Sequence, residues 1–590
     1  MIRYVIDASA APSHTFAVTL TVPRPAAEQR LSLPVWIPGS YLVREFARHL
    51  SGVAAEQGGR AVAIRQLDKA SWAAHCEGEA ELVVRYRVYA FDVSVRAAFV
   101  DATRGFFNGT GVCLRVEGRE REAHGLALTG LLAGWEIATT LAPQGHGSGH
   151  EFIACDYDEL VDHPVELGRF WRGRLDAAGI AHEFVVAGAL PDFDGERLLA
   201  DTKRICETAI AFWHGAAGKP PFDRYVFLLN AVDEGHGGLE HRSSSALVSP
   251  RRELPRRAQP GESGAGAAPV EPSEGYAGLL GLIAHEYFHA WNVKRLKPRD
   301  FAALDYGREN YTELLWFFEG FTSYYDDLFV ARSGLVDAPR YLKLLGKTIT
   351  AVAATPGREV QSVAAASFDA WVKYYRQDEN TPNATVSYYA KGSLVALAFD
   401  LTLRSVGKGS LDEVMRRLWS QSGGGPIDET DIAAALEAVG GRSYAAEISA
   451  WVHGTDELPL ESLLSRFGVV FDRQPATLAQ RVGVRVSEGP LTGVKVTHVL
   501  RGGAGESAGL APGDELIAAG GWRLRRFDDA LRSFSPGGET SLVVARDQRV
   551  FSLALDARAL AGAGAGAVQL RRAETASAEA RALCEAWIAG

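Results

Sequence analysis

The alternation of apolar and polar residues divides the chain into segments of different predicted structure. Up to about residue 185, the runs TFAVTLTVP, ELVVRYRVYAF and GVCLRVEG alternate or are rich in β-branched and aromatic residues, with Gly, Pro and Asp between them. Runs of this kind are typical of half-buried strands. The sequence therefore predicts a β-rich, sandwich-like domain over residues 1–185.

The pattern changes at about residue 190. ERLLADTKRICETAIAFWHGAAG has apolar residues at helical spacing, whereas RYVFLLN and SSSALVSP are short runs typical of buried strands. A stretch rich in Pro, Gly and Ser, ELPRRAQPGESGAGAAPVEPSEG, predicts a surface loop. Helical periods then dominate to about residue 455, so we expect a second, mostly helical α+β domain over residues 186–464.

Short strand runs return in GVKVTHVL, DELIAAGG, TSLVVARD and VFSLALD. The segment AGLAPGDELIAAGG is similar to a turn and strand of PDZ domains, in which GLxxGDxI is frequent. We therefore expect a PDZ-like domain over residues 465–557. Residues 558–590 are rich first in Ala and Gly and then in Ala, Arg and Glu, which predicts a linker and a C-terminal helix.

Composition excludes several classes of protein. The chain has 590 residues, 47% of them hydrophobic and 23% charged, which is typical of a folded protein of several domains. The formal net charge is −10, and the Arg251–Arg257 patch carries no interleaved aromatics, so nucleic acid is not an expected partner. The sequence has no run of about 18 apolar residues, so a membrane helix is not predicted. Five scattered cysteines and the lack of a signal-peptide core predict a cytoplasmic protein.

The run GLLGLIAHEYFHAWNV contains His285, Glu286 and His289 in the pattern H-E-x-x-H. Two histidines four positions apart lie on one face of a helix, so both can bind one metal ion. Both lie in an otherwise apolar helix, where a buried polar group without a partner is costly. The pattern therefore predicts a zinc site with one ion, with Glu286 beside the metal as the general base.

A third protein ligand is expected from the run ENYTELLWFFEGFTSYYDDLFV. Glu319 follows four bulky apolar residues in this predicted helix, and the aromatic residues around it indicate a buried face. Glu309 and Glu313 are the competing candidates. A metal in this setting would polarise a water and a scissile carbonyl, while Glu286 would carry the water's proton to the leaving amine. Peptide hydrolysis is the matching reaction.

The chain resembles the glycyl aminopeptidases of peptidase family sixty-one, a group of gluzincin metallopeptidases. The resemblance rests on LPVWIPGSYLVREFARH, GGLEHRSSS, HEYFHAWNVKRLKP and FFEGFTSYYDD, followed by a PDZ-like unit, and it spans nearly the whole chain. It implies a thermolysin-like catalytic domain and a preference for small N-terminal residues, Gly and Ala.

The family is similar to the alanyl aminopeptidases, and this similarity implies two further roles. The strand G-x-M-E-N of those enzymes corresponds to GGLEH here, so Glu240 would bind the substrate's terminal ammonium, with Gly238 on the same edge. His241 replaces the Asn of that pattern. A tyrosine in the setting Y-x-K-G stabilises the oxyanion in those relatives, which implies Tyr389, with Tyr388 as the fallback.

Two alternatives remain open. An endopeptidase of the same clan would have the zinc site, but Glu240 would not bind a substrate amine. A catalytically silent scaffold would use the PDZ-like domain to bind a peptide C-terminus. The expected partners of the enzyme are peptides with a free N-terminus.

Overall fold

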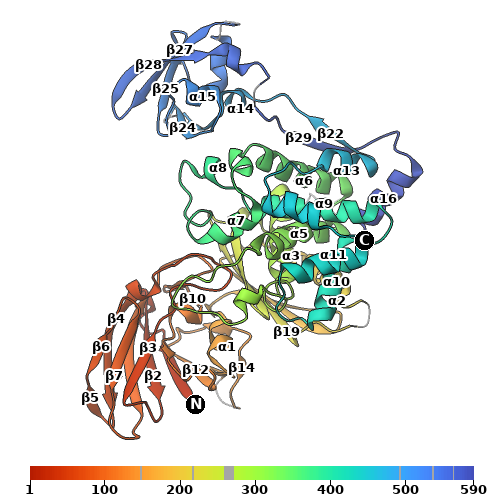
Figure 1. Cartoon of the computed structure of the whole chain (residues 1–590). Helices are drawn as coiled ribbons and strands as arrows, with labels where there is room; N and C mark the ends of the chain where they lie inside the picture. The colour runs from red at the N-terminus through yellow and green to blue at the C-terminus, as the bar shows by residue number, and fades with distance from the viewer. Residues whose placement is uncertain (146–148, 216–217, 258–270, 491–492, 534–536, 563) are drawn as a thin grey trace. The chain divides into compact units, whose positions relative to one another are not determined.

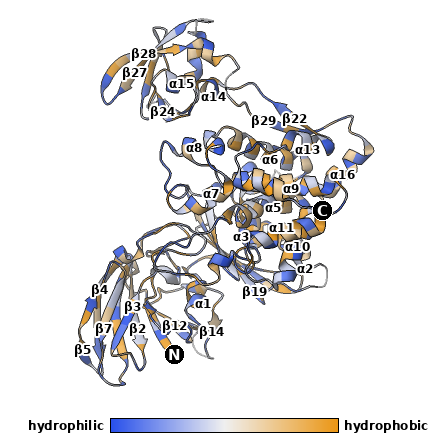
Figure 2. Ribbon diagram, viewed as in Figure 1, coloured by the Kyte–Doolittle hydropathy of each residue, from blue (hydrophilic) through white to orange (hydrophobic). Residues whose placement is uncertain are grey.

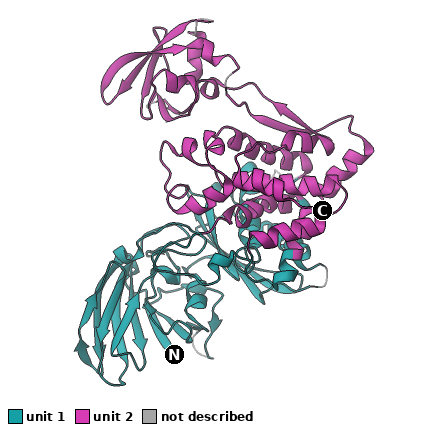
Figure 3. Ribbon diagram, viewed as in Figure 1, with its two compact units in different colours: residues 1–311, 332–336, 418–427 teal, residues 312–331, 337–417, 428–590 magenta. Residues whose placement is uncertain are grey.

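The computed structural model describes residues 1–145, 149–215, 218–257, 271–490, 493–533, 537–562 and 564–590. Most of the loop expected at 253–275 lies outside these residues. Two compact units are distinguished in Figure 3: residues 1–311, 332–336 and 418–427, and residues 312–331, 337–417 and 428–590. Among the described residues, none of the helices has both the length and the apolar character that a membrane span requires.

The first 170 residues form the predicted β-rich domain (Figure 1). Its strands are β1 (Ile2–Asp7), β2 (Thr15–Val22), β3 (Glu28–Ser32), β4 (Leu50–Gln57), β5 (Arg60–Val62), β6 (Ile64–Gln66), β7 (Ser71–His75), β8 (Leu82–Tyr89), β9 (Ala98–Val100), β10 (Arg104–Phe107), β11 (Arg115–Val116), β12 (His124–Thr129), β13 (Glu136–Ala138), β14 (Ala142–Pro143), β15 (Glu151–Ala154) and β16 (Val165–Gly168). The largest sheet has the order β14-β15-β12-β1-β2-β8-β4-β5, and two smaller sheets have the orders β13-β16-β10-β9 and β11-β3-β7-β6.

Apolar and polar residues alternate along many of these strands because, as predicted, one face of each such strand is buried. In β2, Phe16, Val18, Leu20 and Val22 are buried and the residues between them are partly exposed. Hydrophobic and hydrophilic residues are accordingly interspersed along the strands in Figure 2. Because alternate side chains of a strand point to opposite faces, one face of the sheet forms the core of this domain.

A further sheet of the same unit, which we call the second sheet, packs against the helix with the H-E-x-x-H pattern. Its order is β17-β18-β19-β21-β20, with β17 (Trp171–Ala177), β18 (Ile180–Ala187), β19 (Arg224–Val232), β20 (Gly237–Glu240) and β21 (Ser244–Pro250). Helix α2 (Gly195–His214) packs against β17, and α3 (Glu274–Phe288) packs against β20 and β21. Helix α1 (Tyr157–Val161) precedes the sheet. The sheet and α3 thus place the GGLEH edge beside the two histidines.

The region from residue 315 to residue 466 is helical, as expected. Its helices are α4 (Leu315–Phe318), α5 (Gly320–Arg332), α6 (Ala338–Ala353), α7 (Val363–Phe368), α8 (Thr381–Ala384), α9 (Ala390–Ser405), α10 (Leu411–Ser422), α11 (Glu429–Gly440), α12 (Ala445–Ile448) and α13 (Leu460–Arg466). The run predicted as one helix around Glu319 is two helices, α4 and α5, which meet at this residue.

The PDZ-like segment of the second unit has its own hydrophobic core. Its elements are α14 (Leu478–Val482), β23 (Val484–Gly489), β24 (Gly493–Val499), α15 (Ala504–Ser507), β25 (Glu515–Ala519), β26 (Trp522–Arg523), β27 (Glu539–Arg546) and β28 (Arg549–Asp556). Strand β22 (Val469–Arg473) before this segment pairs with β29 (Val568–Arg572) after it. The residues expected as a linker therefore contain a strand, and α16 (Ala578–Ile588) follows it.

Candidate active site

The predicted metal-binding helix is α3. Its N-cap is Ser273, whose hydroxyl accepts a hydrogen bond from the backbone N–H of Tyr276 at 3.1 Å. His285 and Glu286 lie in its last turn, and His289 is its C-cap residue, with a backbone N–H that donates to the carbonyl of His285. The local sequence thus places both histidines at the C-terminal end of one helix.

The two imidazoles are arranged as zinc ligands would be. The Nε2 atoms of His285 and His289 are 3.1 Å apart. Two nitrogens bound to one tetrahedral zinc ion at ~2.0–2.1 Å would be about 3.3 Å apart. The Nδ1 of buried His289 lies 2.8 Å from the carbonyl oxygen of Asn292, so Nδ1 carries the proton and Nε2 the lone pair that a metal binds. The residues present therefore fit a zinc ion.

Glu286 is held close to the edge of the second sheet. A Cβ built on Gly238 would lie only 2.1 Å from Oε1 of Glu286, so the absence of a side chain at residue 238 makes room for this carboxylate. The hydroxyl of buried Tyr225 donates to the backbone carbonyl of Glu286 at 3.3 Å. The first contact leaves space for the carboxylate and the second holds the backbone of Glu286, a residue that is 5% exposed.

Glu240 ends β20 and is also buried, at 4% exposure. A carboxylate oxygen of Glu240, one of Glu286 and a ring nitrogen of His289 all lie within 4.8 Å of one another. On its other side, Glu240 contacts the turn at Gly39, where a Cβ would lie 2.4 Å from Oε2. The structure therefore brings together four of the predicted site residues and Gly238 in one unit.

Glu319 and Tyr389, the remaining predicted residues, belong to the second unit. Glu319 is 2% exposed, whereas its competitor Glu313 is exposed and Glu309 is partly exposed. Burial, followed by the negative charge of Glu319, raises the pKa of Tyr389 well above its usual value. Glu319 likewise adds to the raised pKa of Tyr374. Glu319 is thus a buried carboxylate whose charge contributes to the raised pKa of two neighbouring tyrosines.

Tyr389 is the N-cap residue of α9 and is partly exposed, whereas Tyr388 beside it is completely buried. The hydroxyls of Tyr389 and Tyr375 are 3.3 Å apart, and the ring of Tyr374 stacks on that of Tyr389 at 5.5 Å. The raised pKa keeps the Tyr389 hydroxyl protonated, so it can donate a hydrogen bond at any ordinary pH.

Two positioning groups were not predicted from the sequence. The carbonyl of Asn292 orients His289, but a backbone acceptor has no side-chain signature. Tyr225 contacts the backbone of Glu286, and its place in the run RYVFLLN indicated only a buried strand. The alternation of polar and apolar residues in that run is weak, so a functional tyrosine could not be separated from a packing one.

Comparison with protein families gives three matches along the chain. Residues 3–169 match the model for the Peptidase M61 N-terminal domain, residues 278–395 match M61 glycyl aminopeptidase, and residues 473–535 match the PDZ domain. The modules and their order are those expected from the sequence. Comparison with curated proteins gives no match.

Among solved structures, an aminopeptidase N family protein from Idiomarina loihiensis is similar over 100% of both chains, with 35% sequence identity and a TM-score of 0.90. An M1 zinc metallopeptidase from Deinococcus radiodurans is 15% identical, with a TM-score of 0.46 over 78% of this chain and 94% of that chain. The second likeness is too weak to say anything about the chemistry of this chain.

Proposed function

The chain belongs to the M61 peptidase family, and from this premise we propose that it is a zinc-dependent aminopeptidase that removes N-terminal Gly and Ala from peptides. The family establishes that the chain is a peptidase with a C-terminal PDZ domain. The zinc ion, the small-residue preference and the roles of the residues are our inferences from the geometry and the resemblance.

One zinc ion would be held by His285 and His289 of the first unit and Glu319 of the second. The 3.1 Å separation of the two Nε2 atoms and the burial of Glu319 support this assignment. When bound, zinc supplies a Lewis acid that polarises the scissile carbonyl and lowers the pKa of a water ligand.

Glu286 would act as the general base and then as the general acid. Its carboxylate takes a proton from the attacking water and delivers it to the nitrogen of the leaving peptide. The Gly238 backbone on one side and the hydrogen bond of Tyr225 to its carbonyl hold Glu286 in place during both transfers. Tyr389 would donate its hydroxyl proton in a hydrogen bond to the developing oxyanion.

The proximity of Glu240 to Glu286 and His289 carries the aminopeptidase assignment. Two buried carboxylates within 4.8 Å of each other repel, and a cation between them relieves the repulsion. The terminal ammonium of a substrate would supply this charge when the first peptide bond lies beside Glu286. Peptides whose amine is acylated lack the charge, so their binding is disfavoured.

The PDZ domain would bind a peptide C-terminus at strand β23. This strand is at the end of the sheet order β23-β24-β25-β27-β28, and an edge strand can add an extended peptide through backbone hydrogen bonds. We infer a cytoplasmic location from the cysteines, all five of which are free thiols and four of which are buried.

Hydrolysis of glycyl and alanyl p-nitroanilides by the zinc-loaded protein tests the proposal. Glu286→Gln at matched zinc content should lower kcat by at least ~10²-fold. Glu240→Gln should raise KM, because it removes the charge that binds the ammonium. N-acetylation of the substrate should abolish cleavage by the wild-type protein.

The same experiment separates the alternatives. Cleavage of acetylated peptides with no effect of Glu240→Gln would identify an endopeptidase. Peptide binding at the PDZ domain without turnover of any substrate, in protein with one zinc ion per chain, would identify a scaffold.

A further inference from the structure

A cavity in the first unit has Glu240 in its wall and extends beyond the residues assigned to the proposed reaction. Its wall includes Trp36, Gly39, Tyr41, His241, Lys297 and Phe301. The indole N–H of Trp36 donates to the carbonyl of Asp305 at 2.8 Å, and the ring of Tyr41 stacks on that of Phe301 at 6.0 Å. The wall of the cavity thus contains both aromatic rings and polar side chains.

Lys297 is a cation in this wall that makes no side-chain hydrogen bond or ion pair with any described residue. Burial, followed by the nearby charge of Lys294, lowers the pKa of Lys297 to about 8. Lys294 differs, because its ammonium pairs with Asp162 at 2.7 Å. A partly buried ammonium without a partner is unfavourable unless an anion joins it.

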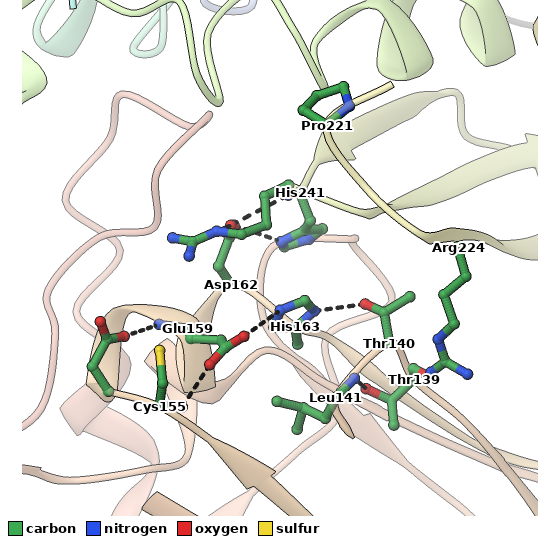
Figure 4. A network of polar contacts seen from close by, with 12 residues as sticks. Thr139, Thr140, Leu141, Cys155, Glu159, Asp162, His163, Pro221, Arg224 and His241 are labelled. Atoms are coloured by element: carbon green, nitrogen blue, oxygen red, sulfur yellow. Dashed lines mark hydrogen bonds and ion pairs between the residues drawn. The ribbon is translucent and has the colours of Figure 1, made fainter. Parts of the chain in front are cut away.

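His241 also lines the cavity and is held by a carboxylate. Figure 4 shows its ring directed at Asp162, and Nδ1 lies 3.3 Å from Oδ1 of that carboxylate. Burial alone would raise the pKa of Asp162, but Lys294, His241 and Arg242 together hold it well below its usual value. Nδ1 of His241 therefore donates to an ionised carboxylate, and its buried Nε2 has no partner among the described residues.

The backbone that carries the lysines is strained. Val293 has a φ of 115°, a conformation that β-branched residues rarely adopt. Its N–H nevertheless donates to the carbonyl of Leu296 at 2.8 Å, which closes a tight turn after the helix with the histidines. Val293, Lys294 and Lys297 all line the cavity. Strain of this kind persists where the surrounding structure imposes it, often at binding sites.

We propose that this cavity binds the carboxylate of a small ligand, which pairs with the Lys297 ammonium. The aromatic wall formed by Trp36, Tyr41 and Phe301 encloses the rest of the ligand. Because Glu240 is also in the wall, the carboxylate can belong either to a free organic acid or to the side chain of an acidic first residue of a substrate. The second source rests on the proposed function, and the first does not.

Titration with sodium acetate at constant ionic strength tests binding, with isothermal titration calorimetry as the readout. The wild-type protein should bind acetate, and Lys297→Met should weaken binding about tenfold or more, because a charge-assisted hydrogen bond is lost. Lys219→Met removes an exposed lysine elsewhere in the unit and should leave binding unchanged. Acetate bound at the zinc site would still bind to Lys297→Met, so this variant distinguishes binding at the zinc site from binding in the cavity.

A second variant guards against misfolding. Ala302→Phe adds bulk to the cavity wall without altering a charge, and it should also abolish acetate binding. Lys297→Met should unfold at the same temperature as the wild-type protein or a higher one, since it removes a charge that burial disfavours. Equal acetate binding by wild type and both variants, or no binding by wild type, would overturn the proposal.

Aspartyl and asparaginyl p-nitroanilides distinguish the two sources of the carboxylate. A wild-type preference for Asp over Asn of about tenfold in kcat/KM that disappears in Lys297→Met identifies the substrate side chain. Acetate binding without this preference identifies a free acid. Glycyl p-nitroanilide is assayed alongside: if no substrate is cleaved while acetate binding depends on Lys297, the proposed function fails and the carboxylate site stands.

Discussion

Gly392 at the start of α9 lies directly against Gly320 at the start of α5: a Cβ built on Gly320 would be 2.6 Å from the Cα of Gly392. A Cβ on Gly392 would in turn be 2.6 Å from the carbonyl oxygen of Trp316. The two glycines follow Glu319 and Tyr389 closely in the sequence. This backbone contact therefore explains why Glu319 lies close enough to Tyr389 for its negative charge to raise the pKa of the tyrosine.

Gly392→Ala should separate these helices. The added methyl group would collide with backbone atoms, which cannot move aside as a side-chain end can, so we expect a loss of ~1–3 kcal/mol in the free energy of unfolding. The activity should fall as well, because Tyr389 moves relative to Glu319. Urea unfolding and kcat are the measurements. Ser393→Ala, one residue further along α9, is the control and should change neither by much.

Gly238→Ala should affect catalysis more than stability. The new Cβ would overlap with Oε1 of Glu286 at 2.1 Å, so the carboxylate must leave its position. We expect kcat to fall by ~10²-fold, as for loss of the general base, with zinc content unchanged. Gly278→Ala on α3 has no atom within 4 Å of its Cβ and should be neutral or stabilising. Normal kcat in Gly238→Ala would remove Glu286 from the role of base.

Tyr389→Phe should lower kcat by ~10²–10³-fold with little change in KM, since the hydrogen bond to the oxyanion forms only in the transition state. Tyr388→Phe, at the completely buried neighbour, should have a much smaller effect on kcat. Because the pKa of Tyr389 is raised, activity should not decline through its ionisation below about pH 10. A larger loss in Tyr388→Phe would transfer the role to that residue.

The sequence predicts local features of the site better than contacts through space. His285, Glu286 and His289 are recognisable because helical spacing alone places them on adjacent faces. The fold class, the order of modules and the family are confirmed by the comparisons. The residue roles and the domain boundaries stay predictions.

The contacts that position the site had no such signal. Gly238 and Glu286 are 48 positions apart, and Gly320 and Gly392 are 72 apart, so no periodicity relates them. Strands β17 and β18 precede the change of pattern at residue 190, yet β18 pairs with β19 and β17 pairs with β18. Their membership of the second sheet follows from tertiary pairing rather than from local propensity. Lys297 is recognisable as unusual only because the structure shows that it lacks a partner.

Two buried histidines should make the protein less stable in weak acid. Burial lowers the pKa of His182 and of His163 to about 4, from an unfolded value of ~6.5. Above pH 6.5 both states are neutral and neither residue contributes to the pH dependence. As the pH falls from 6.5 to 4, only the unfolded chain takes up the protons, so each histidine should lower the free energy of unfolding by roughly 1.4 kcal/mol per pH unit.

His182→Gln isolates one of these contributions. In the wild type, Nδ1 of His182 donates to the Ile180 carbonyl at 2.9 Å, and Nε2 accepts from the Tyr287 hydroxyl at 2.8 Å, so the variant should be less stable at pH 7. Its stability should nevertheless decline less steeply than that of the wild type between pH 6.5 and pH 4, because one proton-binding group is gone. Urea unfolding at several pH values measures the slope, with the exposed His236→Gln as the control. Equal slopes in wild type and His182→Gln would mean that His182 is protonated in the folded protein.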